Sequence, residues 1–487
     1  MEAQTNMSLL PHISLIEEHA GLLLSRGAPC LAMQIADLGL QSDPANPKLR
    51  HLAAIAATRN GKVELAEAHY RAVLECDPQC TGALVNLGIL LAESGRNREA
   101  ETCYRTALKI SPKIPEVHAN LADLLASERK FEEAEIHYRN ALDLDGGKIS
   151  LSNFGVMLSN QGREEEAENC FRKALSIDPH YHLARLNLSF LLLSQERYGE
   201  GWLLHEARHH PGLPENGISC PKTSAPRWQG EDVSGKSILV WGEQGYGDEI
   251  QFCRYVPELA KAGAKVTYAT KPGLEGLMKT LEGVHRVVLQ GFEIGEYDCW
   301  IQAMSLPLFF ETIPNRIPYL AADPKRAGAW KMEGTMKVGI TWHGNPNHRN
   351  DRDRSLPSLS ILSSLFDIPG IRFFSVQAGS GEETQGVECM GKHIRDFSDT
   401  ASILSSLDLL ISVDTANAHL AGAMGIPCWL LLPAFRPDWR WQRNREDSPW
   451  YPGAMRIFRQ EKGREDLVRR LRSELIRLVD ASPSFRL

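Results

Sequence analysis

Three loops in the second half of the chain hold side chains that could move a proton or bind an anion. The first reads GEQGYGD (residues 242–248) and lies between an apolar pentad and a helix-like segment. Gly245 and Gly247 let the backbone turn tightly and bring N–H groups close to a ligand. Asp248 is either the N-cap of the following helix or a general base that accepts a proton from a hydroxyl group.

The second loop, residues 343–355, mixes cationic and acidic side chains. It reads HGNPNHRNDRDRS and follows the apolar segment Lys337–Trp342. Guanidinium groups form bidentate hydrogen bonds with phosphate oxygens, so Arg349 and Arg354 could neutralise a diphosphate. The alternative is a solvated loop whose charges pair with one another.

The third loop, residues 414–425, follows the very apolar segment Leu409–Val413. It reads DTANAHLAGAMG, and Asp414 and Thr415 open a helix whose N–H groups and dipole favour an anion. His419 lies in the next turn, where it could donate a hydrogen bond to a phosphate group. A core histidine with its polar atoms satisfied is the alternative at this position.

Parallel strands are needed to bring these loops together. From residue 237 onwards, short apolar segments alternate with helix-like segments, and this alternation predicts parallel βαβ units. A break marked by Pro314, Pro318 and Pro324 divides the alternation in two. We therefore predict two Rossmann-like domains, residues 209–325 with a linker and residues 326–487. Because ligands of open α/β sheets bind beyond the carboxyl ends of the strands, all three loops should face the cleft between the domains.

The chain up to residue 208 is dominated by an internal repeat with a period of 33 or 34 residues. Each clear copy has a small residue followed four positions later by an aromatic one: Ala66 and Tyr70, Ala100 and Tyr104, Ala134 and Tyr138, Ala167 and Phe171. This pattern resembles the tetratricopeptide repeat, whose antiparallel helix pairs stack into a solenoid. The concave surface of such a solenoid suits a protein or peptide, and a spacer or dimerisation module is the alternative.

Composition narrows the class of protein. The formal net charge of −7 argues against a general nucleic-acid binder, which would usually be basic. The N-terminus shows no secretory signal pattern, and no uncharged stretch reaches the ~18 residues that span a bilayer. The ten cysteines are scattered and form no C-x-x-C pair. These observations predict a cytoplasmic protein without membrane insertion and without a nucleic-acid partner.

As a set, four segments of the second half resemble the glycosyltransferase unit that follows tetratricopeptide repeats in bacterial proteins. They are PRWQGEDVSGKSILVWGEQGYGDEIQFCRY, VGITWHGNPNHRNDRDRS, ISVDTANAHLAGAMGIPCWLLLP and PDWRWQRNREDSPWYP, within residues 225–460. They are similar, more distantly, to the lipopolysaccharide heptosyltransferases and the O-GlcNAc transferases. The resemblance implies an α-solenoid of tetratricopeptide repeats (residues 1–208) followed by an α/β GT-B fold, in which two Rossmann-like domains face a cleft.

The resemblance also implies roles for individual residues. Asp248 matches the catalytic aspartate of the heptosyltransferases. Asp414, Thr415 and His419 match the pattern that holds the donor diphosphate, with Ala416 in place of its glycine. We therefore predict that a nucleotide-sugar is bound, without a metal ion or another cofactor, by this set: Gly245, Gly247, Trp342, Gly344, Asn345, Arg349, Arg354, Gln377, Asp414, Thr415, Asn417 and His419.

The resulting hypothesis is an inverting, metal-independent transfer of a sugar from a nucleotide-sugar to a Ser or Thr hydroxyl of a protein held by the repeats. In the flagellar branch of the family that the chain resembles, repeat-bearing enzymes attach nonulosonic acids to flagellin. Flagellin and a CMP-nonulosonic acid are therefore candidates for acceptor and donor. The alternatives are a non-catalytic adaptor with a degenerate GT-B domain, and a transferase that acts on lipopolysaccharide or another glycan.

Overall fold

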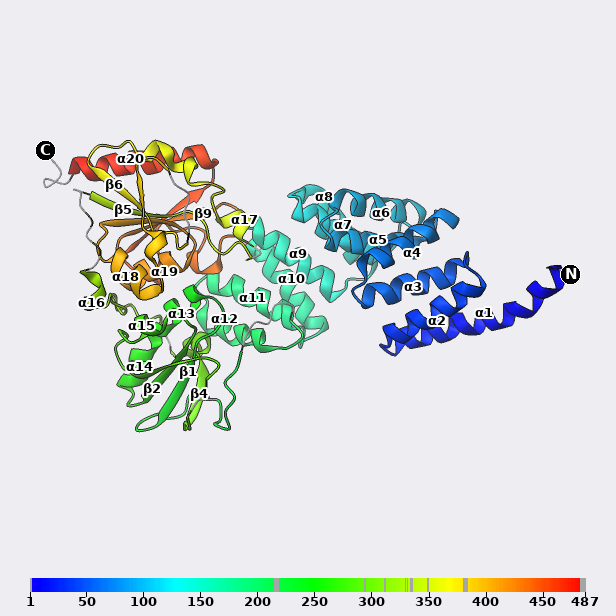
Figure 1. Ribbon diagram of the computed structural model, residues 1–487, viewed down its shortest axis with the longest axis horizontal. Helices are drawn as coiled ribbons and strands as arrows, with labels where there is room; N and C mark the ends of the chain where they lie inside the picture. The colour runs from blue at the N-terminus through cyan, green and yellow to red at the C-terminus, as the bar shows by residue number, and fades with distance from the viewer. Residues whose placement is uncertain are drawn as a thin grey trace. The chain divides into compact units, whose positions relative to one another are not determined.

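The computed structural model describes residues 2–213, 219–292, 295–310, 312–328, 330, 332, 336–347, 350–379 and 384–481, with side chains from residue 12 onwards. Its contacts divide the chain into two compact units, residues 1–184 and residues 185–487. Figure 1 shows the first unit, in its described part, as a series of helices, and the second as two sheets with helices around them.

The first unit consists, in its described part, of antiparallel helix pairs joined by short turns. The helices are α1 (Glu2–Ser25), α2 (Pro29–Ser42), α3 (Pro47–Arg59), α4 (Val63–Cys76), α5 (Thr81–Glu93), α6 (Asn97–Ile110), α7 (Pro115–Ser127), α8 (Phe131–Leu144), α9 (Lys148–Asn160) and α10 (Glu164–Ile177). The next helix, α11 (His182–Ser194), continues past the end of this unit. The two helices of a pair contact each other, and so do the first helices α3, α5, α7 and α9 of successive pairs. This is the solenoid that the period of the repeat predicts.

Small and aromatic residues explain how closely the two helices of a pair approach. A Cβ atom on Gly88 of α5 would lie 2.5 Å from the ring of Tyr104 on α6. A Cβ atom on Gly155 of α9 would lie 2.7 Å from the ring of Phe171 on α10. Both rings are buried. In these two pairs, an aromatic residue of the repeat thus packs against a glycine of the other helix.

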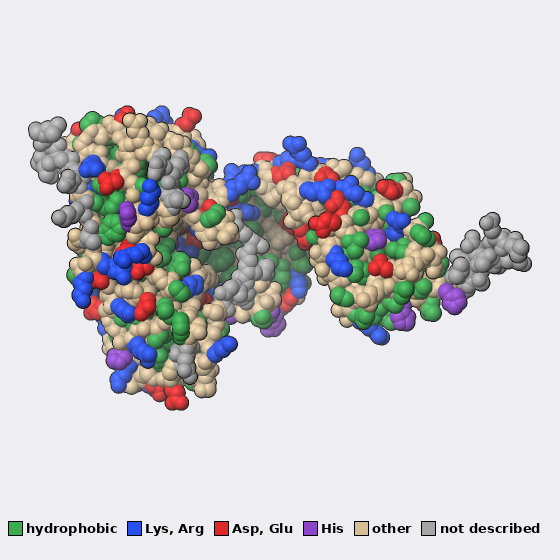
Figure 2. All heavy atoms as spheres, viewed as in Figure 1, with side chains coloured by type: hydrophobic (Ala, Val, Ile, Leu, Met, Phe, Trp, Pro, Cys, Tyr) green, Lys and Arg blue, Asp and Glu red, His purple; other side chains and the backbone are tan. Residues whose placement is uncertain are grey.

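A row of ion pairs connects the second helices of successive pairs. Glu67 of α4 binds Arg71 (2.7 Å) on its own helix and Arg96 (2.7 Å) at the start of α6, and the arrangement recurs around Glu135. Figure 2 shows acidic and basic side chains next to each other on this unit. Exposed pairs of this kind contribute only about 0–1 kcal/mol each. They leave the charges of this row compensated within the chain.

The second unit contains two parallel sheets. The smaller has the strand order β3–β2–β1–β4 and the larger has the order β10–β9–β8–β5–β6–β7, with every pairing parallel. The strands are β1 (Ser237–Trp241), β2 (Lys265–Thr270), β3 (Val284–Leu289), β4 (Cys299–Gln302), β5 (Met336–Thr341), β6 (Ile371–Ser375), β7 (Val387–Cys389), β8 (Leu409–Val413), β9 (Cys428–Pro433) and β10 (Met455–Gln460). Parallel strands require crossover connections, and these place helices on the faces of the sheets.

Helices cover both faces of the larger sheet, α20 and η4 on one side and α18 and α19 on the other (Figure 1). The α-helices after α11 are α12 (Tyr198–His205), α13 (Tyr246–Phe252), α14 (Val256–Lys261), α15 (Glu275–Met278), α16 (Pro324–Ala327), α17 (Asp351–Arg354), α18 (Phe397–Leu404), α19 (Ala416–Ala423) and α20 (Arg464–Ala481). The 3₁₀ helices are η1 (Glu206–His209), η2 (Cys253–Tyr255), η3 (Ala303–Phe309), η4 (Leu359–Leu365), η5 (Gly391–His393) and η6 (Trp439–Trp441). The parallel sheets and their helices agree with the predicted α/β class. The assignment to the GT-B fold stays a prediction.

The helix pair α11–α12 packs with the α/β part of the chain. Trp202 of α12 is buried and makes edge-to-face contacts with Phe252 of α13 (ring centroids 5.8 Å apart) and with Trp439 of η6 (5.6 Å). Large aromatic side chains contribute strongly to such packing. The sequence assigns both helices to the repeat region, which ends at residue 208 in that prediction. In the structure the second compact unit already begins at Arg185.

The longest helices are α1 with 24 residues and α20 with 18 residues. Helix α20 is amphipathic, because Leu467, Leu471 and Leu475 pack against the larger sheet while its exposed side carries arginine and carboxylate groups. Among the described helices, none is both long and apolar enough to cross a bilayer.

Candidate active site

A cavity of about 820 Å³ lies in the second unit, where the loops that follow β1, β5, β6 and β8 meet. Most residues of the predicted set line it: Gly245, Gly247, Asp248, Gly344, Asn345, Arg354, Gln377, Asp414, Thr415, Asn417 and His419. The structure therefore brings the three loops together, as expected for loops at the carboxyl ends of parallel strands. The roles of these residues in binding and catalysis stay predictions.

Among the described residues of the predicted set, Trp342 does not line the cavity. Trp342 is buried in the core with Val338 and Ile340, on the face of the larger sheet that α20 and η4 cover. Successive side chains of a strand point to opposite faces, so Thr341 lines the cavity and the next residue turns away from it. Arg349 lies outside the described residues, so its prediction stays open.

Asp248 takes part in a helix cap and also lines the cavity. Its Oδ2 accepts a hydrogen bond from the backbone N–H of Gly245 (2.8 Å), so it caps the first turn of α13. Its Oδ1 forms an ion pair with Arg440, and the side chain is 18% exposed at the cavity. The N-cap itself is Gly245, so Asp248 takes part in the cap from the third helical position and not as the N-cap that the sequence predicts, and its carboxylate also faces the cavity.

Arg440 is a site residue that the sequence analysis did not identify. Its side chain is only 8% exposed, and it binds Asp248 and Asp438 (2.8 Å). The guanidinium group also lies 4.8 Å from the centre of the Trp439 ring. A buried charge is stable only when it is paired, and these neighbours provide that compensation. Because Asp248 is 192 positions away in the sequence, local spacing gives no sign of this contact.

The surroundings of Asp414 raise the pKa of its carboxyl group. Burial raises its pKa, the carboxylate of Asp438 adds to the rise, and the positive charge of Arg440 opposes it. The result is a pKa of about 6. A carboxyl group whose pKa is close to 6 can exchange a proton near physiological pH. Shifted pKa values of this kind are common in functional sites.

His419 of α19 packs closely against α13. A Cβ atom on Gly247 would lie 2.8 Å from the His419 ring, so only glycine fits in this turn of α13. The Nδ1 atom of His419 shares a hydrogen bond with the Tyr451 hydroxyl (2.8 Å), and its ring stacks on Trp441 with 5.2 Å between centroids. Burial lowers the pKa of His419 well below its usual range, so the imidazole is neutral. If Tyr451 donates to Nδ1, then Nε2 carries the ring proton and can donate to an anion.

The second loop contains the internal ion pair that the alternative interpretation expects. Arg354 binds Asp351 (3.3 Å), and the hydroxyl of Ser355 donates to the same carboxylate (2.7 Å). That hydroxyl also accepts the backbone N–H of Gly344 (2.9 Å), whose missing side chain leaves room for Arg354. The loop is thus held internally, while Arg354 and Asn345 still line the cavity.

Asn417 has a structural contact at the base of the third loop. Its amide group donates to Thr341 Oγ1 (3.0 Å) and to the carbonyl oxygen of Val376 (3.1 Å). These acceptors lie at the ends of β5 and β6, so Asn417 ties α19 to two strands of the larger sheet. Direct ligand contact is not needed to explain this asparagine.

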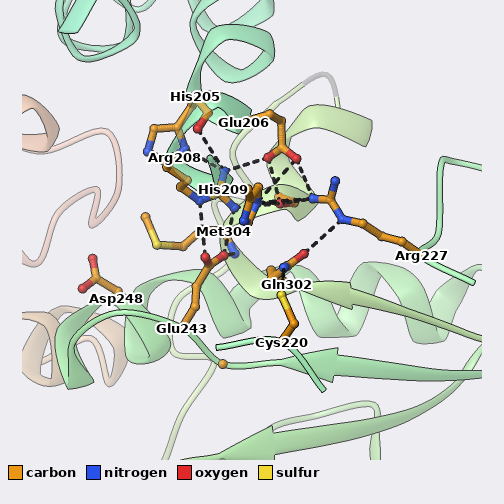
Figure 3. Close-up of polar contacts among 12 residues, drawn as sticks. His205, Glu206, Arg208, His209, Cys220, Arg227, Glu243, Asp248, Gln302 and Met304 are labelled. Carbon is orange, nitrogen blue, oxygen red and sulfur yellow. Dashed lines mark hydrogen bonds and ion pairs between the residues drawn. The ribbon is translucent and has the colours of Figure 1, made fainter. Parts of the chain in front are cut away.

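A second buried arginine, Arg208 of η1, lines the cavity from the helical side. Its guanidinium group binds the carboxylates of Glu243 (2.9 Å) and Glu206 (2.7 Å), as Figure 3 shows. Glu243 also accepts a hydrogen bond from the backbone N–H of Met304 (3.1 Å). Because Glu243 belongs to the loop that carries Asp248, this network fixes the loop relative to η1 and η3.

The same network extends to Arg227, which binds Glu206 (Figure 3). Burial alone would raise the pKa of Glu206, but the charges of Arg208 and Arg227 outweigh it and lower the pKa to about 2. Burial, together with the charge of Arg208, lowers the pKa of His209 to about 3. The cluster therefore contains two guanidinium groups and two glutamates, so its buried charges are compensated.

Further residues at the cavity were missed by the sequence analysis. They are Phe190, Arg208, Gln244, Tyr246, Thr341, Arg436, Asp438 and Arg440. A weak signal exists for part of this set, because the segment PDWRWQ contains Asp438 and Arg440 around an aromatic residue. Within the described residues no group of three or more His, Cys, Asp or Glu side chains is placed to hold a metal ion. The expectation that the reaction needs no metal stays a prediction.

Family models described as tetratricopeptide repeat match residues 85–149 and 149–177. They confirm the repeat interpretation for this part of the chain. Repeats of this class generally present a concave surface to a peptide or protein, which supports a role in protein interaction.

A curated relative, the protein FlbA of Caulobacter vibrioides, is 28% identical to this chain over 309 residues. The match covers 55% of this chain and 50% of FlbA, so the chain spans about half the length of that relative. Among solved structures, this chain is similar to a thermophilic tetratricopeptide repeat protein of Thermus thermophilus (19% identity, TM-score 0.33, 37% of this chain and 99% of that chain). It is also similar to PilF of Pseudomonas aeruginosa (19% identity, TM-score 0.38, 42% and 94%).

The charge of Asp414 gives a testable pH dependence. The pKa of Asp414 is about 6 in the folded protein, above the ordinary value of 3.8. The protonated carboxyl group therefore contributes to the stability of the folded protein below pH 4, and this contribution is lost as the pH rises to about 6. Replacing Asp414→Asn removes the buried charge and should increase the free energy of unfolding by roughly 1–3 kcal/mol at pH 8. At pH 4 the variant and the wild type should be about equally stable.

Tryptophan fluorescence during denaturant unfolding can measure this effect, because all ten tryptophans lie between Trp202 and Trp450, in the second unit. The exposed Asp447→Asn replacement is a matched control and should have little effect at either pH. A gain for Asp414→Asn that is as large at pH 4 as at pH 8 would contradict the electrostatic explanation.

Proposed function

We propose that the second unit is a glycosyltransferase, and that the first unit holds its protein substrate. One observation carries the proposal. A single cavity is lined by the carboxylate of Asp248, beside the smaller sheet, and by loops of the larger sheet whose side chains could bind a phosphate group. The cavity volume of about 820 Å³ lies within the ~300–1,000 Å³ typical of small-molecule sites. Two sheets that each contribute one part of the site suit a reaction between two substrates.

In the proposed reaction Asp248 acts as the general base. It accepts the proton of a Ser or Thr hydroxyl while the hydroxyl oxygen attacks the anomeric carbon of the nucleotide-sugar. The bond between this carbon and the phosphate oxygen breaks, and its electron pair leaves with the phosphate group. Attack on the face opposite the leaving phosphate inverts the configuration of the sugar. No metal ion has a part in this proposal.

The departing phosphate needs positive charge and hydrogen-bond donors that are already in place. Arg354 supplies the charge and a planar set of N–H groups. Helix α19, which begins after Thr415, supplies backbone N–H groups at its N-terminus. The neutral ring of His419 can add a further donor. All three positions line the same cavity.

The contacts of Asp248 are compatible with its proposed role. Each of its two oxygens accepts one hydrogen bond, from Gly245 and from Arg440. A carboxylate has about four lone-pair sites, so the acceptor hydroxyl can bind without displacing either partner. The two contacts also prevent rotation of the carboxylate, and a fixed base is what efficient proton transfer needs.

The repeats support the second part of the proposal through a row of asparagines that the sequence analysis overlooked. Asn86, Asn120 and Asn153 occupy equivalent positions on the first helices α5, α7 and α9, which contact one another in series. Asn153 donates to Asp123 (2.9 Å). Within the described part of the chain, Asn86 and Asn120 are partly exposed and make no side-chain hydrogen bond. Amide groups in a row can bind the backbone of an extended polypeptide irrespective of its sequence.

Flagellin and a CMP-nonulosonic acid are the acceptor and donor to test first, because repeat-bearing enzymes in the flagellar branch of the family that the chain resembles use these substrates. The charged loops of the site fit phosphate in general and do not favour one sugar. A glycan acceptor is the second candidate, and a non-catalytic adaptor is the third.

Replacing Asp248→Asn should lower the rate of transfer by about 10²–10⁴-fold, because the amide cannot accept the hydroxyl proton. The reaction is followed by mass spectrometry of flagellin incubated with the full chain and a CMP-nonulosonic acid, with UDP- and GDP-sugars in parallel. The Asp447→Asn variant is a matched control, since Asp447 is 61% exposed and does not line the cavity. It should retain transfer within about tenfold of the wild type.

Undiminished turnover by Asp248→Asn would exclude this residue as the base. If the wild type transferred no sugar to protein but modified lipopolysaccharide, the acceptor assignment would be wrong and the transferase assignment correct.

Replacing both Asn86→Ala and Asn120→Ala should weaken acceptor binding and leave the chemistry intact. Two lost hydrogen bonds of about 1 kcal/mol each predict a KM for the protein acceptor that is roughly thirtyfold higher, with unchanged hydrolysis of the donor. Asn169→Ala on α10, a second helix, is the matched control. An unchanged KM in the double variant would show that the asparagine row does not hold the acceptor.

A further inference from the structure

Helix α11 continues the sequence repeat and also forms part of the α/β unit. In the sequence it continues the repeat, because Asn187 stands 34 positions after Asn153 in the asparagine row. In the structure its residues from Arg185 onwards belong to the α/β unit, and Leu186 and Phe190 line the cavity. These two side chains are four positions apart, so they lie on the same face of the helix.

The helix pair that carries these side chains is firmly attached to the α/β unit. Trp202 contacts aromatic rings of two other elements, Phe252 of α13 and Trp439 of η6. Arg208 binds the buried carboxylate of Glu243. Phe190 itself lies 5.8 Å, centroid to centroid, from the buried ring of His205. The apolar surface is therefore a fixed wall of the cavity.

The chemistry of this wall differs from that of the rest of the cavity. The loops of the larger sheet present arginine, asparagine, threonine and histidine side chains, which suit phosphate and sugar hydroxyls. Leu186 and Phe190 are partly exposed to the cavity and have no polar group to offer. Covering them with an apolar group would be favourable, whereas a phosphate group there would lose hydration without compensation.

We propose that Leu186 and Phe190 form a subsite for an apolar side chain next to the acceptor Ser or Thr of the protein substrate. The inference rests on the proposed function. A polypeptide is the favoured occupant, because the helix that presents the subsite also carries the last asparagine of the repeated row. Asn187 and the two apolar side chains thus lie on one helix within the second unit. The enzyme selects acceptor sites by their apolar neighbours as well as by the hydroxyl group.

Two synthetic peptides test the subsite with the full chain. Each has one central Ser in an otherwise polar sequence, and the residues that flank it are leucines in one peptide and glutamines in the other. The donor is a mixture of UDP-, GDP- and CMP-linked sugars, and both peptide modification and donor hydrolysis are measured. The wild type should prefer the leucine peptide by about tenfold or more in kcat/KM, since one apolar side chain in a pocket is worth a factor of this size.

Variants of the wall identify the origin of that preference. Leu186→Ser and Phe190→Ser should each reduce kcat/KM for the leucine peptide about tenfold, with unchanged values for the glutamine peptide and for donor hydrolysis. Phe190→Leu should keep the preference. Leu203→Ser is the matched control, because Leu203 on the adjacent helix α12 is 57% exposed and does not line the cavity.

The readouts separate failure of the subsite from failure of the enzyme. If the wild type hydrolyses a donor but modifies both peptides equally, or if Phe190→Ser and Leu186→Ser keep the preference, the subsite assignment is overturned and the transferase stands. If the wild type neither hydrolyses any donor nor modifies any peptide, the proposed function is overturned together with the subsite.

Discussion

The buried guanidinium group of Arg440 joins the two sheets of the α/β unit. It lies in η6, beyond the larger sheet, and binds Asp248 in the first turn of α13, which follows the smaller sheet. Since an unpaired buried charge costs several kcal/mol, the two carboxylates that compensate Arg440 must stay beside it. The same approach of α13 and α19 is possible only because Gly247 leaves room for His419. The geometry of the cavity thus depends on the ion pair between Arg440 and Asp248 and on the absence of a side chain at Gly247.

A second buried arginine imposes a similar constraint on the helical side. Arg208 holds Glu243 at one end of the first loop, and Arg440 holds Asp248 at the other. The loop that supplies the proposed base is therefore fixed at both ends by charges from distant parts of the sequence. Preorganisation of this kind favours catalysis because the reacting group needs no further ordering when substrate binds. It also makes the α11–α12 helix pair a structural part of the proposed transferase.

Local patterns predict much of this structure from sequence. The period of the repeat predicts the helix pairs. The alternation of apolar segments predicts the parallel sheets, and the strand-end loops converge on one cavity. The misses have physical reasons. Arg208 binds Glu243, 35 positions away in the sequence, and Arg440 binds Asp248, 192 positions away. Sequence periodicity gives no sign of such contacts. Trp342 lies one position too far along its strand to reach the cavity, because its side chain turns to the opposite face.

The central claim is that the cavity of the α/β unit binds a nucleotide-sugar, and thermal unfolding in the presence of nucleotides tests it most directly. Tryptophan fluorescence of the full chain reports only the second unit, where all ten tryptophans lie. A ligand at a hundred times its Kd stabilises by about 2.7 kcal/mol, which corresponds to several degrees in Tm. We expect at least one of UDP, GDP, CMP and their sugar conjugates to produce such a shift, and Arg354→Met to reduce it. Unchanged Tm values with every nucleotide at millimolar concentration would contradict the account.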